Sequence, residues 1–246
     1  MLTDKYIMKT TRLLLIAALA FAGTALQAQE VKPVEASVED YIALLNQNGY
    51  QAYSFDISNL KDATYNILFE VREYVAGNPE PIKVTPYGRG LQNRTMVEDF
   101  MWQELSEDEL SEIKAASIDF ENGVFSRADK ITVGFLPCKN DSTEVGRIFV
   151  ENEGNVGFNL KLKPIDHKGA YDDDMIYQYN TLPFTASVFE DGKFIPLATY
   201  ASFWYDERFK IIRFCGAEEV DPDMTADILE ETPHYFVIGV ILTKVK

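Results

Sequence analysis

Beyond residue 116 the sequence consists largely of short apolar runs separated by turn signals, and this pattern constrains the fold more than any other feature. Between Val156 and Lys163, Val, Phe and Leu residues alternate with Gly, Asn and Lys. This period of two is typical of a half-buried strand in an antiparallel sheet. Short strands that recur about every ten residues with turns between them are typical of sandwiches and barrels. We therefore expect a mainly β protein, folded as an antiparallel β-sandwich.

Three dipeptides with turn-forming composition predict hairpins. They are Asn122-Gly123, Asp191-Gly192 and Asp206-Glu207, and each stands between two strand-like runs. The paired runs are Ile118–Phe120 with Val124–Phe125, Phe184–Phe189 with Lys193–Leu197, and Tyr200–Tyr205 with Phe209–Phe214. The last run, Tyr235–Leu242, is apolar on both faces. It therefore predicts a central strand that is buried on both sides.

Helix signals are confined to the first half of the chain. A capping-box pattern at Ser37 opens the first predicted helix, and Asn48-Gly49 ends it. The second predicted helix is Glu107–Ala116, with Ser106 as its N-cap. It forms part of a helical insertion near residues 95–116, of which the segment before Ser106 is ambiguous between helix and strand.

Period-two alternation also marks a strand near the middle of the first half. Tyr65, Ile67, Phe69 and Val71 alternate with residues of mixed polarity. The sequence contains neither a repeat of fixed period nor a low-complexity linker. We expect one domain over residues 29–246, and the alternative is a boundary near residue 116.

The N-terminus has the organisation of a secretory signal peptide. Lys9 and Arg12 precede an apolar run of about ten residues, Leu13–Ala22, which is too short to span a bilayer. The small residue Ala28 offers a cleavage site, so the mature chain is expected to begin at Gln29.

This leader predicts a location in the periplasm or outside the cell. Residues 1–28 form the signal peptide, and Met8 is the expected true start because a normal signal-peptide opening follows it. The alternative is an uncleaved membrane anchor. No later run reaches the ~18 apolar residues of a spanning helix, so no membrane span is expected after cleavage.

The mature chain is strongly acidic. The whole sequence has a net charge of −16, and residues 1–28 contain three basic residues and one acidic residue, a net of +2, which leaves −18. Such a charge argues against nucleic acid and anionic membranes as partners.

The chain has two cysteines, Cys138 and Cys215. In an oxidising compartment such a pair is a candidate disulfide. Two buried free thiols are the alternative.

Aromatic side chains are the first candidates for a ligand site. Tyr177 and Tyr179 fall on one face of a strand-like run, and Trp204 falls on another. Rings on an exposed sheet face can bind the apolar faces of sugars, whereas rings on an inner face fill the core. Both outcomes are open for these three residues.

Metal and catalytic motifs are weak. Asp172, Asp173 and Asp174 form an acidic loop that could supply oxygen ligands to Ca²⁺, the one candidate cofactor, or be a solvated turn. The two histidines, His167 and His234, lack neighbours at metal-ligand spacing. No pair of acids can be chosen for glycoside hydrolysis from sequence alone.

The N-terminal segment also resembles the signal peptides of a known group of bacteria. Met8-Lys9-Thr10-Thr11-Arg12-Leu13-Leu14-Leu15-Ile16, followed by the cut at Leu26-Gln27-Ala28-Gln29-Glu30, resembles signal peptides of gut Bacteroidetes. The rest resembles the small secreted domains of unknown function of those bacteria, which names no activity. If the resemblance holds, Asp141-Ser142-Thr143 resembles their short O-glycosylation sequon, with Ser142 as the glycan site.

These observations favour a non-enzymatic binding or interaction protein. A glycan or cell-surface component is the first expected ligand, and a protein partner is the second. The alternatives are a secreted hydrolase of the glycosidase type, whose acids are unidentified, and an adhesin-like structural subunit.

Overall fold

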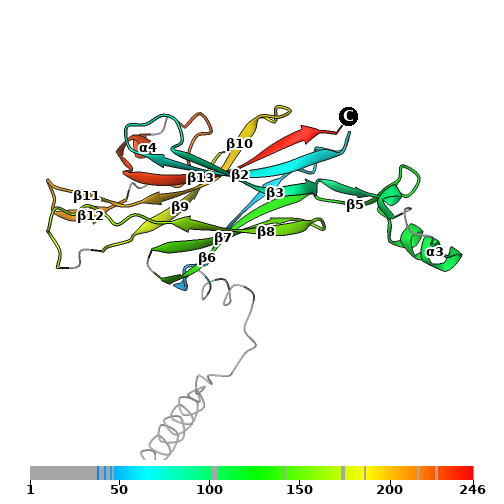
Figure 1. Ribbon diagram of the computed structural model, residues 1–246, viewed down its shortest axis with the longest axis horizontal. Coiled ribbons are helices and arrows are strands. Elements are labelled where there is room, and N and C mark those ends of the chain that lie inside the picture. Colours follow the sequence, from blue (N-terminus) through cyan, green and yellow to red (C-terminus); the bar gives the residue numbers. More distant parts are fainter. Residues whose placement is uncertain are drawn as a thin grey trace, which may run out of the picture. The chain divides into compact units, whose positions relative to one another are not determined.

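The structure is a computed structural model of the chain (Figure 1). It describes residues 38, 42, 45, 47–100, 105–140, 142–172, 175–185, 187–214, 217–224 and 227–245, of which 99–100, 137–140 and 227–228 are described by their backbone alone. The chain divides into two units, residues 1–41 and residues 42–246. All of the described strands belong to the second unit.

The described part of this unit is built mainly from strands. The strands are β1 (Gln51–Asp56), β2 (Tyr65–Val75), β3 (Lys83–Gln92), β4 (Arg94–Met96), β5 (Val124–Arg127), β6 (Lys130–Asn140), β7 (Thr143–Val150), β8 (Gly154–Lys161), β9 (Tyr179–Pro183), β10 (Phe194–Ser202), β11 (Trp204–Asp206), β12 (Ile211–Arg213) and β13 (His234–Lys244). The helices are the 3-10 helix η1 (Val97–Phe100) and the α-helices α3 (Glu107–Ala116) and α4 (Asp227–Glu231). The prediction of a mainly β fold is confirmed.

Two larger sheets and two small ribbons organise the strands, and all of their pairings are antiparallel. The four-stranded sheet has the order β1-β6-β7-β8, and the five-stranded sheet has the order β3-β2-β13-β10-β9. The ribbons are β4-β5 and β11-β12. The last strand, β13, lies at the centre of the larger sheet, so the prediction of a central final strand is confirmed.

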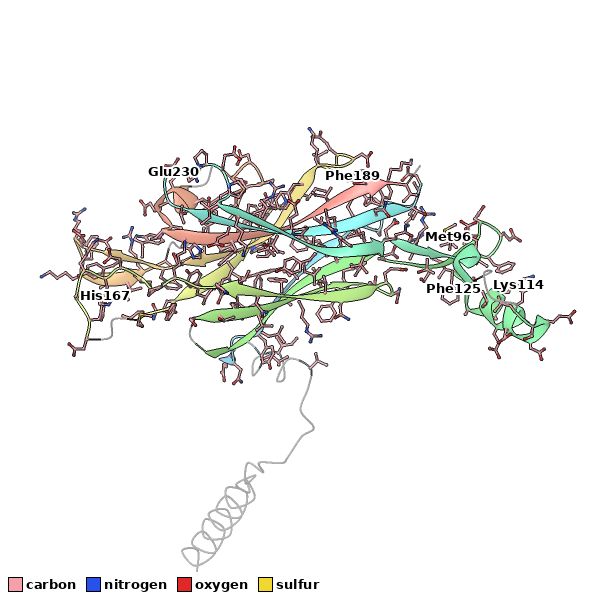
Figure 2. All side chains as sticks on the ribbon, viewed as in Figure 1. Met96, Lys114, Phe125, His167, Phe189 and Glu230 are labelled. Carbon is pink, nitrogen blue, oxygen red and sulfur yellow. The ribbon has the colours of Figure 1, made fainter. Side chains whose placement is uncertain are left out.

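The main hydrophobic core contains side chains from both larger sheets. Ile131 and Ile148 of the four-stranded sheet belong to the same buried cluster as Phe69, Ile238 and Leu242 of the five-stranded sheet. Each such side chain contributes about 1.5–3 kcal/mol by leaving water. Side chains crowd the space between the ribbons of these sheets (Figure 2).

A second buried cluster covers the opposite face of β13. It includes Tyr235 and Val237, whereas Phe236 and Ile238 belong to the main core. The Tyr235 ring stacks on Tyr74 of β2, with ring centroids 4.9 Å apart. Burial on both faces explains why this strand has no alternating polar residues.

Strands β2 and β8 show the predicted alternation of buried and more exposed side chains. In β2, the side chains of Tyr65, Ile67, Phe69 and Val71 are buried, and in β8 those of Phe158 and Leu160 are buried. The intervening residues of β8, including Asn159, are exposed. Both strand predictions are confirmed.

The helix Glu107–Ala116 has the predicted bounds and the predicted cap. The Ser106 hydroxyl accepts a hydrogen bond from the Glu109 N–H, and the Glu109 carboxylate accepts one from the Ser106 N–H. The helix contacts β5, which pairs with β4, and Lys114, Phe125 and Met96 mark these three elements in Figure 2. Residues 94–96, at the start of the predicted insertion, form a strand.

Of the first predicted helix, Val38, Ile42, Leu45 and Gln47 are described, and they are helical. The remaining residues of that helix and the predicted signal peptide lie outside the described residues.

The predicted strand Phe184–Phe189 is wrong. The edge strand that pairs with β10 is β9, which ends at Pro183, and Phe184 forms only an isolated bridge with Val220. Its apolar residues are used for packing outside a ladder, since Phe189 makes an edge contact with the Tyr65 ring. The spacing of the apolar residues in this segment therefore resembles that of a strand, although these residues pack outside a sheet.

The predicted run Tyr200–Tyr205 divides between two sheets. Tyr200 belongs to β10, whereas Trp204 opens β11 and is paired with Arg213. The turn at Asp206 is confirmed, although the hairpin is shorter than predicted.

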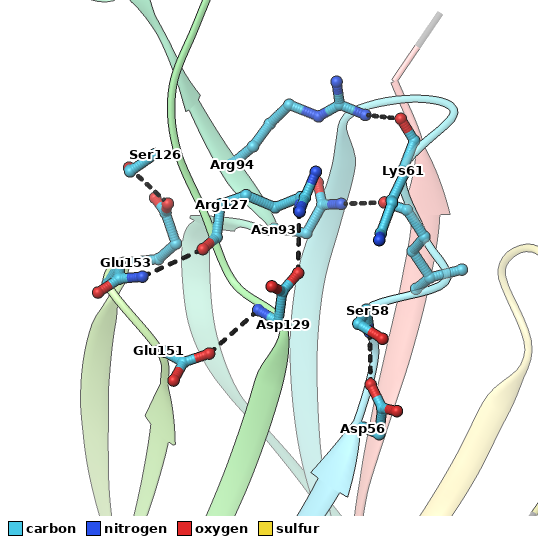
Figure 3. Close-up of polar contacts among 12 residues, drawn as sticks. Asp56, Ser58, Lys61, Asn93, Arg94, Ser126, Arg127, Asp129, Glu151 and Glu153 are labelled. Atoms are coloured by element: carbon cyan, nitrogen blue, oxygen red, sulfur yellow. Dashed lines mark hydrogen bonds and ion pairs between the residues drawn. The ribbon is translucent and has the colours of Figure 1, made fainter. Parts of the chain in front are cut away.

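Buried hydrogen bonds hold the loop after β1 against the junction of β3 and β4 (Figure 3). The Asn93 carboxamide accepts from the Tyr65 N–H at 2.8 Å and donates to the Leu60 carbonyl at 3.0 Å. Arg94 donates to the Lys61 carbonyl at 3.3 Å. Because Asn93 is fully buried, these bonds rigidify this end of the sheets.

Candidate functional site

The edge strands of the two larger sheets, β3 and β8, approach each other (Figure 1). A groove of about 1050 Å³ is lined by residues of these strands and their neighbours. On one side it is lined by Val71 and Glu73 of β2 and by Lys83, Thr85 and Tyr87 of β3. Val71 faces the main core, and residues two apart on a strand share a face. This wall is therefore the inner face of the five-stranded sheet.

The other side of the groove lies on the outer face of the four-stranded sheet. Its lining residues include Val145 and Arg147 of β7 and Asn159 and Lys161 of β8. They alternate with buried residues such as Leu160, which face the core. The lining of the groove thus joins the core-facing side of β2 and β3 to the exposed face of β7 and β8.

A close contact on β7 sets the position of that edge. A Cβ on Gly146 would lie 2.0 Å from the Phe158 ring, so the absence of a side chain lets Phe158 pack flat against β7. The Phe158 ring centroid is also 6.1 Å from that of Tyr87. Gly146 and Phe158 therefore bring β8 towards the wall that Tyr87 forms.

Positive charge predominates in the groove. Among the described lining residues, four cations, Lys83, Arg147, Lys161 and Lys163, and one carboxylate, Glu73, give a formal charge of +3. The whole chain has the opposite balance, with 39 acidic and 23 basic residues. The groove is a basic site on an acidic protein.

The carboxylate of the groove is held by a buried hydrogen-bond chain. Glu73 accepts from His234 Nε2 at 3.1 Å, and His234 Nδ1 lies 2.6 Å from the Tyr179 hydroxyl. Burial lowers the pKa of His234 and raises the pKa of Tyr179. With a neutral ring, His234 Nε2 donates to Glu73 and Nδ1 can accept from the Tyr179 hydroxyl, which also lies 3.2 Å from the Lys163 carbonyl oxygen.

The same chain positions Lys163 at the mouth of the groove. The Lys163 N–H donates to the Tyr179 hydroxyl at 2.9 Å, and its ammonium lies 3.7 Å from the Glu73 carboxylate. The negative charge of Glu73 is thus balanced by Lys163. Because His234 has only 3% of its side chain exposed, this arrangement suits positioning of groove residues rather than contact with a ligand.

Comparison with known families identifies the chain at the level of a family. The domain of unknown function DUF5041 matches residues 20–244. The chain belongs to the DUF5041 family. No curated protein and no solved structure matches it. That this DUF5041 protein falls in a family of unknown function is confirmed, while its bacterial group and its secretion stay predictions.

The three aromatic residues that the sequence singled out lie apart in this DUF5041 fold. Tyr179 opens β9 and stacks on Tyr200 with centroids 5.3 Å apart, packed against the main core. Tyr177 lies in the segment before β9 and is half-buried. Trp204 belongs to the β11-β12 ribbon, with Arg213 over its ring at 5.5 Å. They form no common strip in the strand pairing, and their role in binding stays a prediction.

The other predicted site residues are only partly described. Asp172 is exposed, whereas Asp173 and Asp174 lie outside the described residues. Within the described part of the chain, no group of His, Cys, Asp and Glu side chains is arranged to hold a metal ion. The calcium site therefore stays a prediction.

The disulfide and the glycosylation site also stay predictions. Cys215 and the side chain of Cys138 lie outside what the structure describes. Ser142 is exposed in the turn between β6 and β7. Among the described residues, no helix is long and apolar enough to cross a membrane.

Sequence reasoning missed the charged residues of the groove. Lys161 and Lys163 stood out only as the polar positions of a strand, and Glu73, Lys83 and Arg147 belonged to no motif. The usable signal was the presence of cations at solvent-exposed positions of strands in an acidic chain. Nothing in the sequence showed that these strands meet at one edge.

Proposed function

We propose that this chain is a secreted or periplasmic binding protein that holds a glycan or another cell-surface component in the groove beside β8, without changing it chemically. The observation that carries the proposal is the groove itself. Its volume of about 1050 Å³ is at the upper end of the range for ligand sites. It runs onto an exposed sheet face, which suits a chain-like ligand.

The composition of the groove wall supports a saccharide ligand. Tyr50 and Tyr87 offer ring surface, and Thr85, Thr143 and Asn159 offer hydroxyl and amide groups. Saccharides have alternating apolar faces and hydroxyls, and such mixed walls match both.

The scaffold that we propose is an antiparallel β-sandwich formed by the two larger sheets. A single buried cluster that contains Val133 and Phe135 of β6 together with Val240 and Phe236 of β13 supports this packing. The inner faces of two sheets that share one core are the defining feature of a sandwich.

Binding is favoured over hydrolysis by the charges of the groove. A glycosidase uses two carboxyl groups about 5–10 Å apart. The described lining contains one carboxylate, Glu73, which is engaged by His234 and Lys163. The lining residues that the structure describes do not supply the convergent acids that this chemistry needs.

A thermal-shift screen tests the proposed function. The protein purified after expression of the full chain is heated with a panel of neutral and acidic polysaccharides. A ligand at a hundred times its Kd adds about 2.7 kcal/mol of stability, a rise in Tm of several degrees.

The site is tested by a matched pair of variants. Asn159→Trp fills the groove, and Asn155→Trp adds the same bulk at an exposed position of β8 that does not line it. We expect the ligand-induced rise to disappear in Asn159→Trp alone. A panel in which no polysaccharide raises Tm would contradict the proposal.

A further inference from the structure

The positive charge of the groove is unexpected in a chain in which acidic residues predominate. Acidic residues outnumber basic ones by 39 to 23, yet the described part of the lining contains four cations and one carboxylate. Like charges that face one cleft repel each other, and a cleft with low-dielectric walls focuses their field. Such an arrangement is stabilised when an anion occupies the cleft.

Three of these cations have no anionic partner within the described residues. Lys163 lies beside Glu73, but no carboxylate of the described part of the chain forms an ion pair with Lys83, Arg147 or Lys161. Lys83 is the cross-strand partner of Glu73, yet Glu73 bonds to His234 and Lys163. The charge available to a ligand is therefore that of the three other cations.

The spacing of the cations fits an extended ligand. On the outer sheet face, Lys161 is paired with Thr143, and Arg147 is paired with Gly157. The two cations are thus four residues apart along the strand direction, about 13 Å at ~3.3 Å per residue. One small anion cannot span that separation, whereas a polymer with repeated charges can. Lys83 of β3 lines the same groove from the five-stranded sheet.

We infer that the groove beside β8 binds an anionic polysaccharide, through carboxylate or sulfate groups that contact Lys83, Arg147 and Lys161. This inference rests on the proposed function and adds the chemical class of its ligand. The neutral polar groups between the cations, such as Asn159 and Thr85, bind the hydroxyls of the same chain. The net charge of −16 keeps other polyanions, nucleic acid included, from the rest of the surface.

Affinity measurements on the full chain test the ligand class. The probes are polygalacturonate for carboxylates, heparin for sulfates, dextran for a neutral chain and single-stranded DNA for a different polyanion. We expect polygalacturonate, heparin or both to bind, with dextran and DNA at least tenfold weaker. Tighter binding of polygalacturonate than of heparin would identify the acidic groups as carboxylates, and tighter binding of heparin would identify them as sulfates. Raising NaCl from 50 to 300 mM should weaken binding at least tenfold, because salt screens exposed charges.

A charge-matched pair of triple variants tests the residues. Lys83→Gln with Arg147→Gln and Lys161→Gln removes the three groove cations that form no ion pair among the described residues. Lys114→Gln with Lys193→Gln and Lys210→Gln removes the same total charge elsewhere on the surface. We expect the first variant to lose at least tenfold in affinity and the second less than threefold. Circular dichroism and Tm confirm that both are folded.

The two proposals fail in different ways. Dextran binding that is lost in Asn159→Trp but unchanged in the groove triple variant and in high salt would overturn the anionic ligand and leave the proposed function standing. Tight binding of single-stranded DNA would overturn the assignment to a polysaccharide. A failure of every polysaccharide to bind would overturn both proposals.

Discussion

His234 lies between the Tyr179 hydroxyl and the Glu73 carboxylate, with 3% of its side chain exposed. Burial lowers its pKa below the ordinary value of about 6.5, and the hydrogen bond to Glu73 acts in the opposite direction. The nearby ammonium of Lys163 also favours the neutral ring. This residue links the core to the groove, because its ring fixes the carboxylate that Lys163 approaches.

The lowered pKa of His234 predicts that acid destabilises the fold. Below about pH 6.5 the unfolded chain binds a proton at this position while the folded chain does not, so the free energy of unfolding falls as pH falls towards the folded pKa. Urea unfolding at pH 7.5 and 5.5 should show this loss, and His234→Gln should remove the part that His234 causes.

An NMR titration of the imidazole signals checks the same prediction without a variant at position 234. The chain has two histidines, so His167→Gln assigns the remaining signal to His234. A folded-state pKa at or above 6.5 would show that the prediction is wrong.

At the scale of elements, the helix α3 is stabilised mainly by interactions among its own residues and its cap. None of its residues is buried, and its capping box satisfies the N–H groups of Ser106 and Glu109. Its first turn contains three acidic residues, which interact favourably with the helix dipole. The cap and these charges, rather than packing, therefore define the helix.

We predict that Ser106→Ala frays α3 and leaves the sheets unchanged. Loss of the cap should cost about 1 kcal/mol of helix stability. Hydrogen exchange should become faster at the amides of α3 and stay the same in β13. Ser111→Ala, at an exposed interior position of the helix, is the control and should leave exchange unchanged or slow it. An equal loss in global unfolding free energy would show that α3 is coupled to the core.

At the scale of the whole molecule, the predicted signal peptide and the charge balance bear on where we expect the protein to work. Removal of residues 1–28 would raise the net negative charge from −16 to −18, since that segment contains three basic residues and one acidic residue. An acidic surface disfavours adhesion to other polyanions. The basic groove is then the place where we propose that an anionic chain binds.

We predict that the protein recovered from an exporting bacterial host begins at Gln29. Intact-mass measurement of the product should match residues 29–246, because Ala28 supplies the small residue at the cleavage site. Ala28→Arg should block processing, while Ala25→Ser, outside that position, should not. A product that retains the apolar run Leu13–Ala22 would contradict the prediction and favour an anchor.

The sequence by itself determined the local elements of this protein. The alternation of β2 and β8 and the cap of α3 were predictable because each depends on the period of side chains along one segment. Even the central position of β13 followed from its apolar character on both faces. The strand Phe184–Phe189 was mispredicted because apolar spacing does not distinguish a ladder from loop packing.

Only the tertiary structure decided the site. Glu73, Lys83, Arg147 and Lys161 come from four strands, and they meet because β2 pairs with β3, β7 pairs with β8, and these pairs form neighbouring edges. Strand order and register are set by contacts between residues far apart in the chain, which no local period records. The aromatic residues were visible in the sequence, but which faces of the sheets they occupy depended on the same long-range pairing.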